Sequence, residues 1–400
     1  PVGGDYILEL FRGPTSAFKD VALSMLPQLI TAARRQEGIS DEVVILTATS
    51  GDTGKAALEG FRDVDRTKIL VFYPDGGVSE IQKLQMVTQE GRNVGVCAVR
   101  GNFDDAQTGV KRIFSDAQLR ETLASRGYFL SSANSINWGR VLPQIVYYVS
   151  SYCDLLASGA IKEGQTVNVC VPTGNFGNIL SGFYAKKMGV PIGRLICASN
   201  ENNVLTDFIR TGVYDRNRAF YNTMSPSMDI LISSNLERLL FALTQDTDEV
   251  KEYMKELAAA GRYQVRDRVR EKLQKRFKGY FCDDKETQRV IREMYDKHGY
   301  LIDTHTAVAF SALEQYRKET GDETVCIVAS TASPFKFCDS VLEALGETKI
   351  AQGLDALDQL SAKTGQPAPA PLSGLRGKQI RFTETVEKDH MVDAVWSMLG

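Results

Sequence analysis

The stretch VVILTATSGDTGKAALEGF, residues 43–61, decides the fold class of this chain. It opens with a continuous apolar run, Val43 to Leu46, and closes with an amphipathic run, Gly54 to Phe61. Continuous apolar strands are typical of parallel sheets that are covered on both faces. The turn between the two runs is rich in hydroxyl residues, which favour helix starts. We therefore expect a buried strand, a tight turn and a helix.

The same alternation recurs along the chain. Further strands are predicted at 6–10, 69–73, 94–99, 167–171, 195–198 and 325–329, and further helices at 78–89, 104–114, 179–188 and 387–399. Strands that alternate with helices predict an α/β fold of doubly wound domains with parallel sheets. Residues 246–278 have helical spacing and no clear strand, which predicts a helical insertion near 246–300, and the proline-rich residues 366–371 predict an extended loop.

Composition excludes several classes of protein. The 400 residues exceed one ordinary domain, and a net charge of -3 without charged blocks gives no reason to expect nucleic acid or a membrane surface. Seven scattered cysteines with no C-x-x-C pair argue against a disulfide framework or a zinc cluster and favour a reducing compartment, and with three histidines we expect no metal site. The chain begins at Pro1 and not at Met, so we expect that upstream residues are missing.

Residues 13–20, GPTSAFKD, combine a Gly-Pro turn with the start of a helix. Thr15 or Ser16 is expected to cap that helix. Lys19 then lies in the first helical turn, near the positive end of the helix dipole. That position favours the uncharged, nucleophilic amine, which can attack an aldehyde. Taken alone, an ordinary solvated lysine explains Lys19 better.

Residues 47–55, TATSGDTGK, join a predicted strand to a predicted helix, where open α/β sheets bind ligands. N–H groups at the helix start and three hydroxyls suit a carboxylate, although a plain capped turn is the alternative. A nucleotide-binding phosphate loop would need G-x-x-x-x-G-K-[ST]. Thr49 stands at the first Gly position and Ala56 follows Lys55, so the segment does not have that pattern.

Two further turns carry residues suited to anions. PTGNFGN, residues 172–178, follows a strand and precedes a helix, and its glycines let the backbone approach a phosphate. NSINWGR, residues 134–140, contains Ser135, Asn137 and Arg140, which could converge on a second anion. Taken alone, a left-handed turn explains the first segment. A helix cap followed by a surface arginine explains the second.

The four segments, in this order, resemble those of the threonine synthase family, in the tryptophan synthase β-like, fold type II group of pyridoxal phosphate enzymes. GPTSAFKD, TSGDTG, NSINWGR and GNFGN are each family-like, and their joint occurrence is far more specific than one motif. The resemblance runs from Tyr6 to about Lys336, and the predicted helical insertion resembles that of the longer branch. In that branch a helical segment precedes the lysine motif, so the resemblance implies that this segment is missing here.

We expect two doubly wound α/β domains with the cofactor between them. Residues 1–40, the lysine-bearing segment, are predicted to join 136–400 in a large cofactor domain, and 41–135 to form a smaller domain. We expect a cytoplasmic monomer or homodimer that binds a small molecule, and neither nucleic acid nor a membrane. Import into an organelle stays open because the N-terminal end looks incomplete.

The resemblance implies a role for each matching residue. Lys19 would be the catalytic residue and would hold pyridoxal 5'-phosphate as a Schiff base. The other cofactor-binding residues would be Asp52 at the ring, Thr331 at the pyridine nitrogen, and Gly174, Asn175, Phe176, Gly177 and Asn178 at the cofactor phosphate. The substrate-binding residues would be Ser50, Gly51 and Thr53 at the carboxylate, and Ser135, Asn137, Arg140 and, more weakly, Lys336 at the substrate phosphate.

The implied activity is that of a carbon–oxygen lyase, threonine synthase, which converts O-phospho-L-homoserine and water to L-threonine and phosphate. Lys19 would remove the α and then a β proton, phosphate would leave from the γ carbon, and water would add at the β carbon. One alternative is a threonine synthase-like phospholyase that yields a 2-oxo acid, ammonia and phosphate. Another is a non-catalytic ligand-sensing protein, against which the intact Lys19 counts. His305 fits either the entrance of the site or a buried core position.

Overall fold

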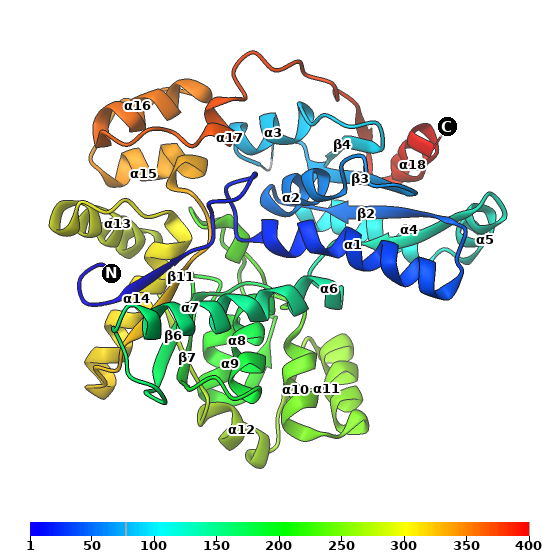
Figure 1. The fold of residues 1–400 in the computed structure, drawn as a ribbon. Coiled ribbons are helices and arrows are strands. Elements are labelled where there is room, and N and C mark those ends of the chain that lie inside the picture. The colour runs from blue at the N-terminus through cyan, green and yellow to red at the C-terminus, as the bar shows by residue number, and fades with distance from the viewer. Residues whose placement is uncertain (77, 400) are drawn as a thin grey trace. The chain divides into compact units, whose positions relative to one another are not determined.

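The computed structural model describes residues 1–76 and 78–399, which form two compact units. Unit 1 combines Pro1–Leu10 with Val141–Lys349, and unit 2 combines Phe11–Arg140 with Ile350–Gly400. Each unit is built of parallel strands flanked by helices (Figure 1). The predicted α/β class with parallel sheets is confirmed.

Unit 2 contains a five-stranded parallel sheet in the order β12-β4-β3-β2-β5. Its strands are β2 (Glu42–Ala48), β3 (Thr67–Pro74), β4 (Val94–Arg100), β5 (Tyr128–Ser132) and β12 (Thr385–Glu387). Its helices are α1 (Lys19–Glu37), α2 (Asp52–Phe61), α3 (Glu80–Val87), α4 (Phe103–Ser115), α5 (Ala117–Ser125), α16 (Leu354–Thr364), α17 (Ala370–Ser373), the short η4 (Lys388–His390) and α18 (Met391–Leu399). The short helix α6 (Trp138–Val141) spans the boundary with unit 1 in the sequence.

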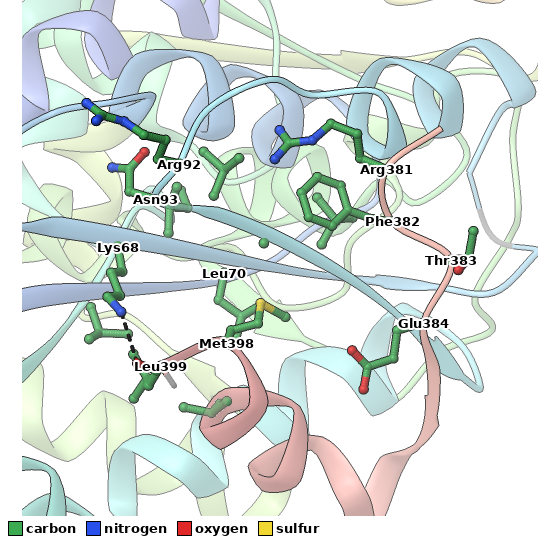
Figure 2. A pocket seen from close by; sticks show the side chains of 16 residues that line it. Lys68, Leu70, Arg92, Asn93, Arg381, Phe382, Thr383, Glu384, Met398 and Leu399 are labelled. Atoms are coloured by element: carbon green, nitrogen blue, oxygen red, sulfur yellow. Dashed lines mark hydrogen bonds between the residues drawn. The ribbon is translucent and has the colours of Figure 1, made fainter. Parts of the chain in front are cut away.

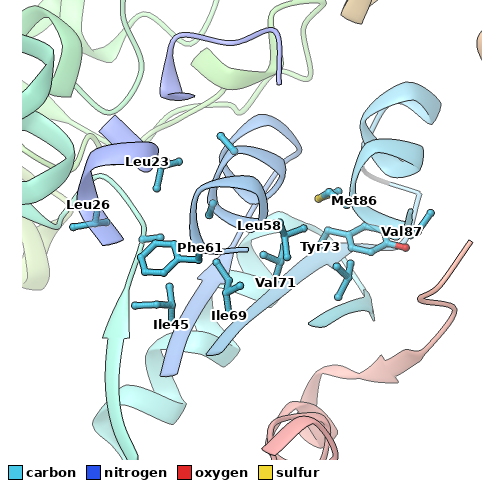
Figure 3. Close-up of a cluster of buried hydrophobic side chains, with 14 of the residues drawn as sticks. Leu23, Leu26, Ile45, Leu58, Phe61, Ile69, Val71, Tyr73, Met86 and Val87 are labelled. Atoms are coloured by element: carbon cyan, nitrogen blue, oxygen red, sulfur yellow. The ribbon is translucent and has the colours of Figure 1, made fainter. Parts of the chain in front are cut away.

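The two faces of the unit 2 sheet bury alternate residues of each strand. Val43 and Ile45 of β2 belong to an apolar cluster with residues of α1, α2 and α3, including Phe61 (Figure 3). Val44 and Leu46 belong to a second cluster with residues of α4, α5 and α18. Because side chains alternate across a strand, one continuous apolar run supplies both clusters. The run at 43–46 is therefore apolar throughout because helices cover both faces.

Unit 1 contains a second five-stranded parallel sheet, in the order β1-β11-β6-β7-β10. Its strands are β1 (Tyr6–Glu9), β6 (Val167–Pro172), β7 (Ile192–Ser199), β10 (Phe277–Phe281) and β11 (Cys326–Ser330), and β8 (Val213–Asp215) pairs with β9 (Arg262–Gln264) in a separate antiparallel ribbon. Its helices are η1 (Leu142–Gln144), α7 (Ile145–Ala157), α8 (Gly177–Lys187), α9 (Val204–Thr211), η2 (Pro226–Met228), α10 (Leu236–Thr244), α11 (Thr247–Ala260), α12 (Asp267–Gln274), α13 (Asp284–His298), α14 (Thr304–Thr320), η3 (Pro334–Phe337) and α15 (Cys338–Ala344). Helix α14 packs across β6, β7, β10 and β11.

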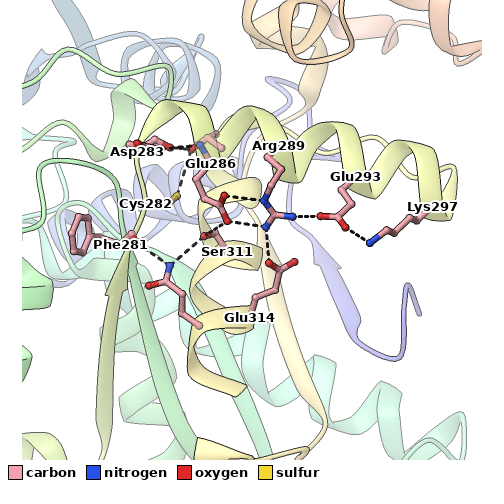
Figure 4. Close-up of polar contacts among 11 residues, drawn as sticks. Phe281, Cys282, Asp283, Glu286, Arg289, Glu293, Lys297, Ser311 and Glu314 are labelled. Atoms are coloured by element: carbon pink, nitrogen blue, oxygen red, sulfur yellow. Dashed lines mark hydrogen bonds and ion pairs between the residues drawn. The ribbon is translucent and has the colours of Figure 1, made fainter. Parts of the chain in front are cut away.

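A charged cluster joins α13 to α14 (Figure 4). Arg289 Nη2 lies 2.8 Å from Glu286 Oε1 on its own helix and 2.7 Å from Glu314 Oε2 on α14. Ser311 Oγ of α14 donates a hydrogen bond of 3.4 Å to Glu286 Oε1. Partly exposed ion pairs add little stability singly. Their arrangement nevertheless specifies which faces of the two helices meet.

The segment 246–300 contains strands that the sequence analysis did not predict. Besides α11, α12 and α13 it contributes β9 and β10, and β10 is an edge strand of the unit 1 sheet, parallel to β7. The prediction that 246–278 contains no clear strand is therefore wrong at 262–264 and at 277–278, where β10 begins. That strand reads Phe-Lys-Gly-Tyr-Phe, and its Lys and Gly interrupt the apolar run that marks the central strands.

The units group the chain differently from the predicted domains. Residues 1–40 were expected to join 136–400, apart from 41–135. Instead, α1 packs on α2 and places Leu23 and Leu26 in the unit 2 core, while β12 extends the unit 2 sheet beside β4. Helix α1 and the segment 382–399 therefore belong with the unit 2 sheet, because their apolar side chains join the two clusters that cover its faces.

Smaller differences concern short elements. The sequence analysis did not predict β5 and β12, because strands of five and three residues carry little periodic signal. The last helix begins at Met391 and not at 387, after β12 and η4. The predicted loop at 366–371 ends in α17, whose first turn tolerates proline because its N–H groups need no intrahelical acceptor.

All seven cysteines are free, and only Cys153 is exposed. Among residues 1–76 and 78–399, no group of three or more His, Cys, Asp or Glu side chains could hold a metal ion. Over the same residues, no helix has both the length and the apolar character needed to cross a membrane.

Candidate active site

In each unit, turns that contain predicted site residues follow strands at a reversal of the strand order. In unit 2 the chain proceeds from β2 to β3 and β4 on one side, and then places β5 on the other side of β2. In unit 1 it proceeds from β6 to β7 and β10 on one side, and places β11 on the other side of β6. Open α/β sheets bind ligands beyond the carboxyl ends of strands at such points. The turns after β2 and β5, and those after β6 and β11, therefore occupy the expected ligand positions of their own units.

Lys19 is the first residue of α1, and the turn before it is held by Asp20. Thr15 donates its N–H to Asp20 Oδ2 at 2.9 Å and its hydroxyl to Asp20 Oδ1. The N-cap of α1 is Phe18, which supplies no side-chain cap. The prediction that Thr15 or Ser16 caps the helix is therefore wrong, because the Thr15 hydroxyl serves the turn. A Cβ at Gly13 would lie 2.4 Å from Asp20 Oδ2, so this close turn requires glycine.

The Lys19 amine lies beside a buried carboxylate. Lys19 Nζ is 3.6 Å from Asp52 Oδ2, and the two side chains are 10% and 3% exposed. Asp52 is the first residue of α2, where a negative charge is stabilised by the helix dipole. Gln82 Nε2 donates a hydrogen bond of 2.8 Å to the other oxygen, Asp52 Oδ1. The carboxylate thus has a neighbour at each of its two oxygens.

The turn after β2 is capped by Thr49. Its hydroxyl accepts hydrogen bonds from Gly51 N at 2.9 Å and Gly54 N at 2.8 Å. Gly51 has a φ of 135°, and a Cβ there would lie 2.4 Å from the Gln82 side chain. Ser50 and Thr53, both half-buried, make no side-chain hydrogen bond to another residue in the described part of the chain. Their hydroxyls therefore remain available to a ligand, whereas the Gly51 N–H is engaged by Thr49.

Lys55 has local partners in the same helix. Its Nζ lies 3.1 Å from Glu59 Oε2 and also donates to Gln89 Oε1. Burial alone would raise the pKa of Glu59, but attraction to Lys55 and a hydrogen bond from Gln89 lower it overall. The lysine is engaged in this local charge pair, in agreement with the absence of a nucleotide-type phosphate loop.

Residues 134–140 follow β5 and lie next to the end of β2. Asn134 Nδ2 donates to Ala48 O at 3.1 Å. Asn137 Oδ1 accepts from Gly139 N at 2.9 Å, and its Nδ2 donates to Ser132 O at 3.0 Å. The amide of Asn137 therefore caps α6 and ties the segment to β5. Arg140, 2% exposed, donates from Nη1 to Ala133 O at 2.6 Å.

The turn after β6 has the geometry of an anion site. Phe176 is left-handed, with a φ of 60°, and its ring packs 5.7 Å from that of Phe277. Helix α8 begins at Gly177, so its first N–H groups have no intrahelical acceptor. Asn178 is 7% exposed, and its Nδ2 has no hydrogen-bond partner among the described residues. An orphaned buried amide beside free helix N–H groups fits a phosphate.

Tyr148 orients the Asn178 amide. The Tyr148 hydroxyl donates to Asn178 Oδ1, which leaves Nδ2 as the free donor. Burial raises the pKa of Tyr148 well above its ordinary value, so the hydroxyl keeps its proton. Sequence reasoning did not identify Tyr148, since the tyrosine lies 30 positions before its partner.

Thr331 and Lys336 follow β11, which lies next to β6 in the unit 1 sheet. Both side chains are buried, at 6% and 1% exposed. His305 receives a hydrogen bond from Ser227 N at its Nε2, 3.2 Å away, and its Nδ1 lies 2.9 Å from Asp303 Oδ1. With both ring nitrogens engaged, His305 is explained by the buried core position and not by the entrance of a site.

A separate cavity of about 320 Å³ lies at the β12 side of the unit 2 sheet (Figure 2). Lys68, Arg381, Glu384 and Met398 are among its lining residues, and Lys68 Nζ donates to Leu399 O at 3.1 Å. The predicted site residues do not line it. It is therefore distinct from the turns described above.

Besides Tyr148, two groups of residues around the predicted site were not identified from the sequence. Gln82 lies in the first turn of α3, outside the four motifs, although the Ser-x-x-Gln capping box that positions it was visible at 79–82. Ser233, Ser234 and Asn235 contact the turn after β6 from almost 60 positions away. Their only local signal was a polar run before a helix, which predicts a cap and not a binding turn.

Comparisons with known proteins place these features in a family. The family described as pyridoxal-phosphate dependent enzyme matches residues 6–331, and the family described as threonine synthase, C-terminal, matches residues 306–395. The chain is 44% identical over 351 residues to threonine synthase-like 1 of Homo sapiens, covering 86% of this chain and 46% of that protein. It is 37% identical to threonine synthase of Saccharomyces cerevisiae, covering 98% of this chain and 77% of that protein.

Solved structures agree with the sequence matches. The chain superimposes on the crystal structure of threonine synthase from Brucella melitensis with bound pyridoxal phosphate, with a TM-score of 0.83 and 35% identity. That match covers 98% of this chain and 77% of the Brucella chain. The present chain spans about half the length of the human threonine synthase-like 1 protein that it matches.

Proposed function

This chain belongs to the threonine synthase family of pyridoxal-phosphate dependent enzymes, and on that premise we propose that it converts O-phospho-L-homoserine and water to L-threonine and phosphate. The observation that carries the proposal is the match of residues 306–395, from α14 to α18, to the C-terminal family named after threonine synthase. The match of residues 6–331 alone supports only a pyridoxal-phosphate enzyme. We also propose a cytoplasmic location and a monomeric or homodimeric state.

The cofactor is pyridoxal 5'-phosphate, and the turn after β6 fits the phosphate group of that cofactor. When bound, it supplies an electron sink that stabilises negative charge on substrate carbons. Lys19 would bond to it through Nζ, with Asp52 at the ring. Gly174, Asn175, Phe176, Gly177 and Asn178 would hold its phosphate, and Thr331 would meet the pyridine nitrogen. The orphaned Asn178 Nδ2 is the observation that supports the phosphate assignment.

Lys19 would also move protons. A lysine amine that alternates between charged and neutral forms can take a proton from the α carbon and then from the β carbon. The Asp52 carboxylate, 3.6 Å from Lys19 Nζ, would orient the amine. Gln82 holds that carboxylate by its 2.8 Å hydrogen bond, so the carboxylate stays close to the amine between proton transfers.

The remaining predicted residues would bind the two ends of the substrate. Ser50 and Thr53 would donate hydroxyls to the carboxylate from the turn that Gly51 makes possible. Ser135, Arg140 and Lys336 would meet the substrate phosphate. Asn137 would act indirectly, because its amide is engaged by Gly139 N and Ser132 O and holds the start of α6 in place.

A second candidate is a phospholyase that yields a 2-oxo acid, ammonia and phosphate. The observation that favours it is the 44% identity to human threonine synthase-like 1, against 37% to yeast threonine synthase. Both reactions would use the same residues to bind a phosphorylated amino acid and release phosphate. They differ in whether water adds to the β carbon before release.

Product analysis separates the two candidates. The purified full chain is loaded with pyridoxal 5'-phosphate and given O-phospho-L-homoserine in water enriched in ¹⁸O. Threonine with one ¹⁸O in its side-chain hydroxyl is the expected main product, measured by mass spectrometry together with released phosphate. A preponderance of 2-oxobutyrate and ammonia contradicts the proposal, and product formation in the Lys19→Ala variant contradicts the role of Lys19.

A further inference from the structure

The turn after β6 is hydrogen-bonded by a segment distant in the sequence, residues 223–235, which we call the strap. Ser233 Oγ donates a hydrogen bond of 2.8 Å to Gly174 O. Asn235 Nδ2 donates one of 2.9 Å to Asn175 O. Two successive carbonyl groups of the turn are thus held by side chains of one segment.

These two bonds determine where the N–H groups of the turn point. In a trans peptide the carbonyl of one residue and the N–H of the next point in opposite directions. A Gly174 carbonyl held by Ser233 therefore turns the Asn175 N–H away from the strap. An Asn175 carbonyl held by Asn235 does the same for the Phe176 N–H. Without these contacts each peptide plane could rotate and direct a carbonyl oxygen at an anion.

The contact between the strap and the turn is close and specific. A Cβ at Gly174 would lie 2.6 Å from Ser227 O, so the strap excludes any other residue there. Ser234 Oγ lies 3.0 Å from Asn175 Oδ1 and holds the Asn175 side chain as well. Asn235 itself is fully buried and has a φ of 94°, a conformation that favours asparagine or glycine.

The strap has its own anchors in unit 1. Ser227 N donates to His305 Nε2 at 3.2 Å, and Ser233 N donates to the Tyr214 hydroxyl at 2.8 Å. Within the strap, Asp229 accepts from Asn200 Nδ2 at 2.7 Å and from Thr223 N at 3.0 Å. A segment held at several points can transmit a fixed geometry to the turn.

We propose that Ser233 and Asn235 are positioning residues that aim the N–H groups of Asn175 and Phe176 at the phosphate group of the cofactor. The inference rests on the proposed function only in taking that phosphate as the ligand of the turn. Part of the phosphate affinity would then depend on two side chains that bond main-chain carbonyl groups of the turn.

The test compares pyridoxal 5'-phosphate with pyridoxal, which has the same aldehyde and ring but no phosphate. The full chain is freed of cofactor, and both dissociation constants are measured by absorbance titration. Loss of one neutral hydrogen bond raises a dissociation constant by roughly 3- to 10-fold. Ser233→Ala should therefore raise the dissociation constant of pyridoxal 5'-phosphate by that factor. Combined with Asn235→Gly, which keeps the positive φ, the loss should exceed roughly tenfold. Pyridoxal binding should change by less than about twofold in both variants, because it lacks the group that the turn binds.

A matched control is Thr206→Val, which removes another buried hydroxyl of unit 1 that donates to a main-chain carbonyl, Tyr280 O, at 3.0 Å. This substitution should change the dissociation constants of pyridoxal 5'-phosphate and pyridoxal equally or not at all. Equal weakening of both ligands by Ser233→Ala, or no weakening of either, overturns the inference. Should Asn235→Gly fail to fold, Ser233→Ala alone decides the outcome. Failure of the unaltered chain to bind pyridoxal 5'-phosphate would instead overturn the proposed function.

Discussion

Replacement of Gln82 by Leu should destabilise unit 2, because the buried Asp52 carboxylate loses the hydrogen bond from the Gln82 amide. Gln82 is 2% exposed, and its Nε2 lies 2.8 Å from Asp52 Oδ1. Its Oε1 also accepts from Ser79 N at 3.3 Å, which closes the capping box of α3. A hydrogen bond to a charged group contributes about 1.5–3 kcal/mol, and a weakened cap costs up to about 1 kcal/mol. We expect Gln82→Leu to lower the free energy of unfolding by about 2–3 kcal/mol.

Gln85→Leu provides the matched control on the same helix. Gln85 is fully buried, its Nε2 donates to Thr15 O at 3.3 Å, and its Oε1 has no partner among the described residues. This substitution removes one long neutral bond together with an unsatisfied acceptor, so the loss should stay within about 1 kcal/mol. Both variants gain the same apolar side chain, and urea unfolding followed by circular dichroism compares them. Equal losses in the two variants would refute the importance of the bond to Asp52.

Three further outcomes are expected. Gly51→Ala places a methyl group 2.4 Å from the Gln82 amide at a φ of 135°. It should lower the free energy of unfolding by about 2 kcal/mol or more, which differential scanning calorimetry detects as a lower melting temperature. With 5,5'-dithiobis(2-nitrobenzoate), the native chain should show one fast thiol, Cys153, and the denatured chain seven; several fast native thiols would contradict the burial described above. Burial alone would raise the pKa of Asp322, but hydrogen bonds from Thr324 and other neighbours lower that pKa below the unfolded value of 3.8. The ionised carboxylate therefore stabilises the fold above pH 3.8, and this stabilisation is lost as the pH falls through the folded pKa. Asp322→Asn should therefore destabilise the chain at neutral pH and progressively less in urea titrations below pH 4, and a difference independent of pH would contradict this.

The fold class could be predicted because the central strands carry a strong local signal. Residues 43–46 are continuously apolar, since helices cover both faces of their sheet, and residues 167–171 are buried throughout and interrupted only by Asn168. The edge strands β10 and β12 carry no such signal, because one contains Lys and Gly and the other has three residues. The assignment of α1 to unit 2 could not be predicted either, because an apolar helix face does not specify which sheet it will cover.

In the candidate site, too, features within one segment could be predicted, and contacts between segments distant in the sequence could not. The turn at 174–178 was predicted because its glycines and its place between a strand and a helix are local features. The strap was not predicted, because Ser233 and Asn235 meet that turn only after the chain has folded. The side-chain amide of Asn137 makes two hydrogen bonds to the main chain, which the sequence did not predict. Resemblance identifies which segments take part, and hydrogen-bond geometry indicates which atoms remain available.

The central claim is that Lys19 carries the cofactor. The most direct test loads the full chain with pyridoxal 5'-phosphate, reduces it with borohydride, digests it and locates the modified lysine by mass spectrometry. We expect a phosphopyridoxyl group on the peptide that contains Lys19, on no other peptide, and none in Lys19→Ala. A stable adduct on another lysine, or none on the unaltered chain, would show that Lys19 does not carry the cofactor.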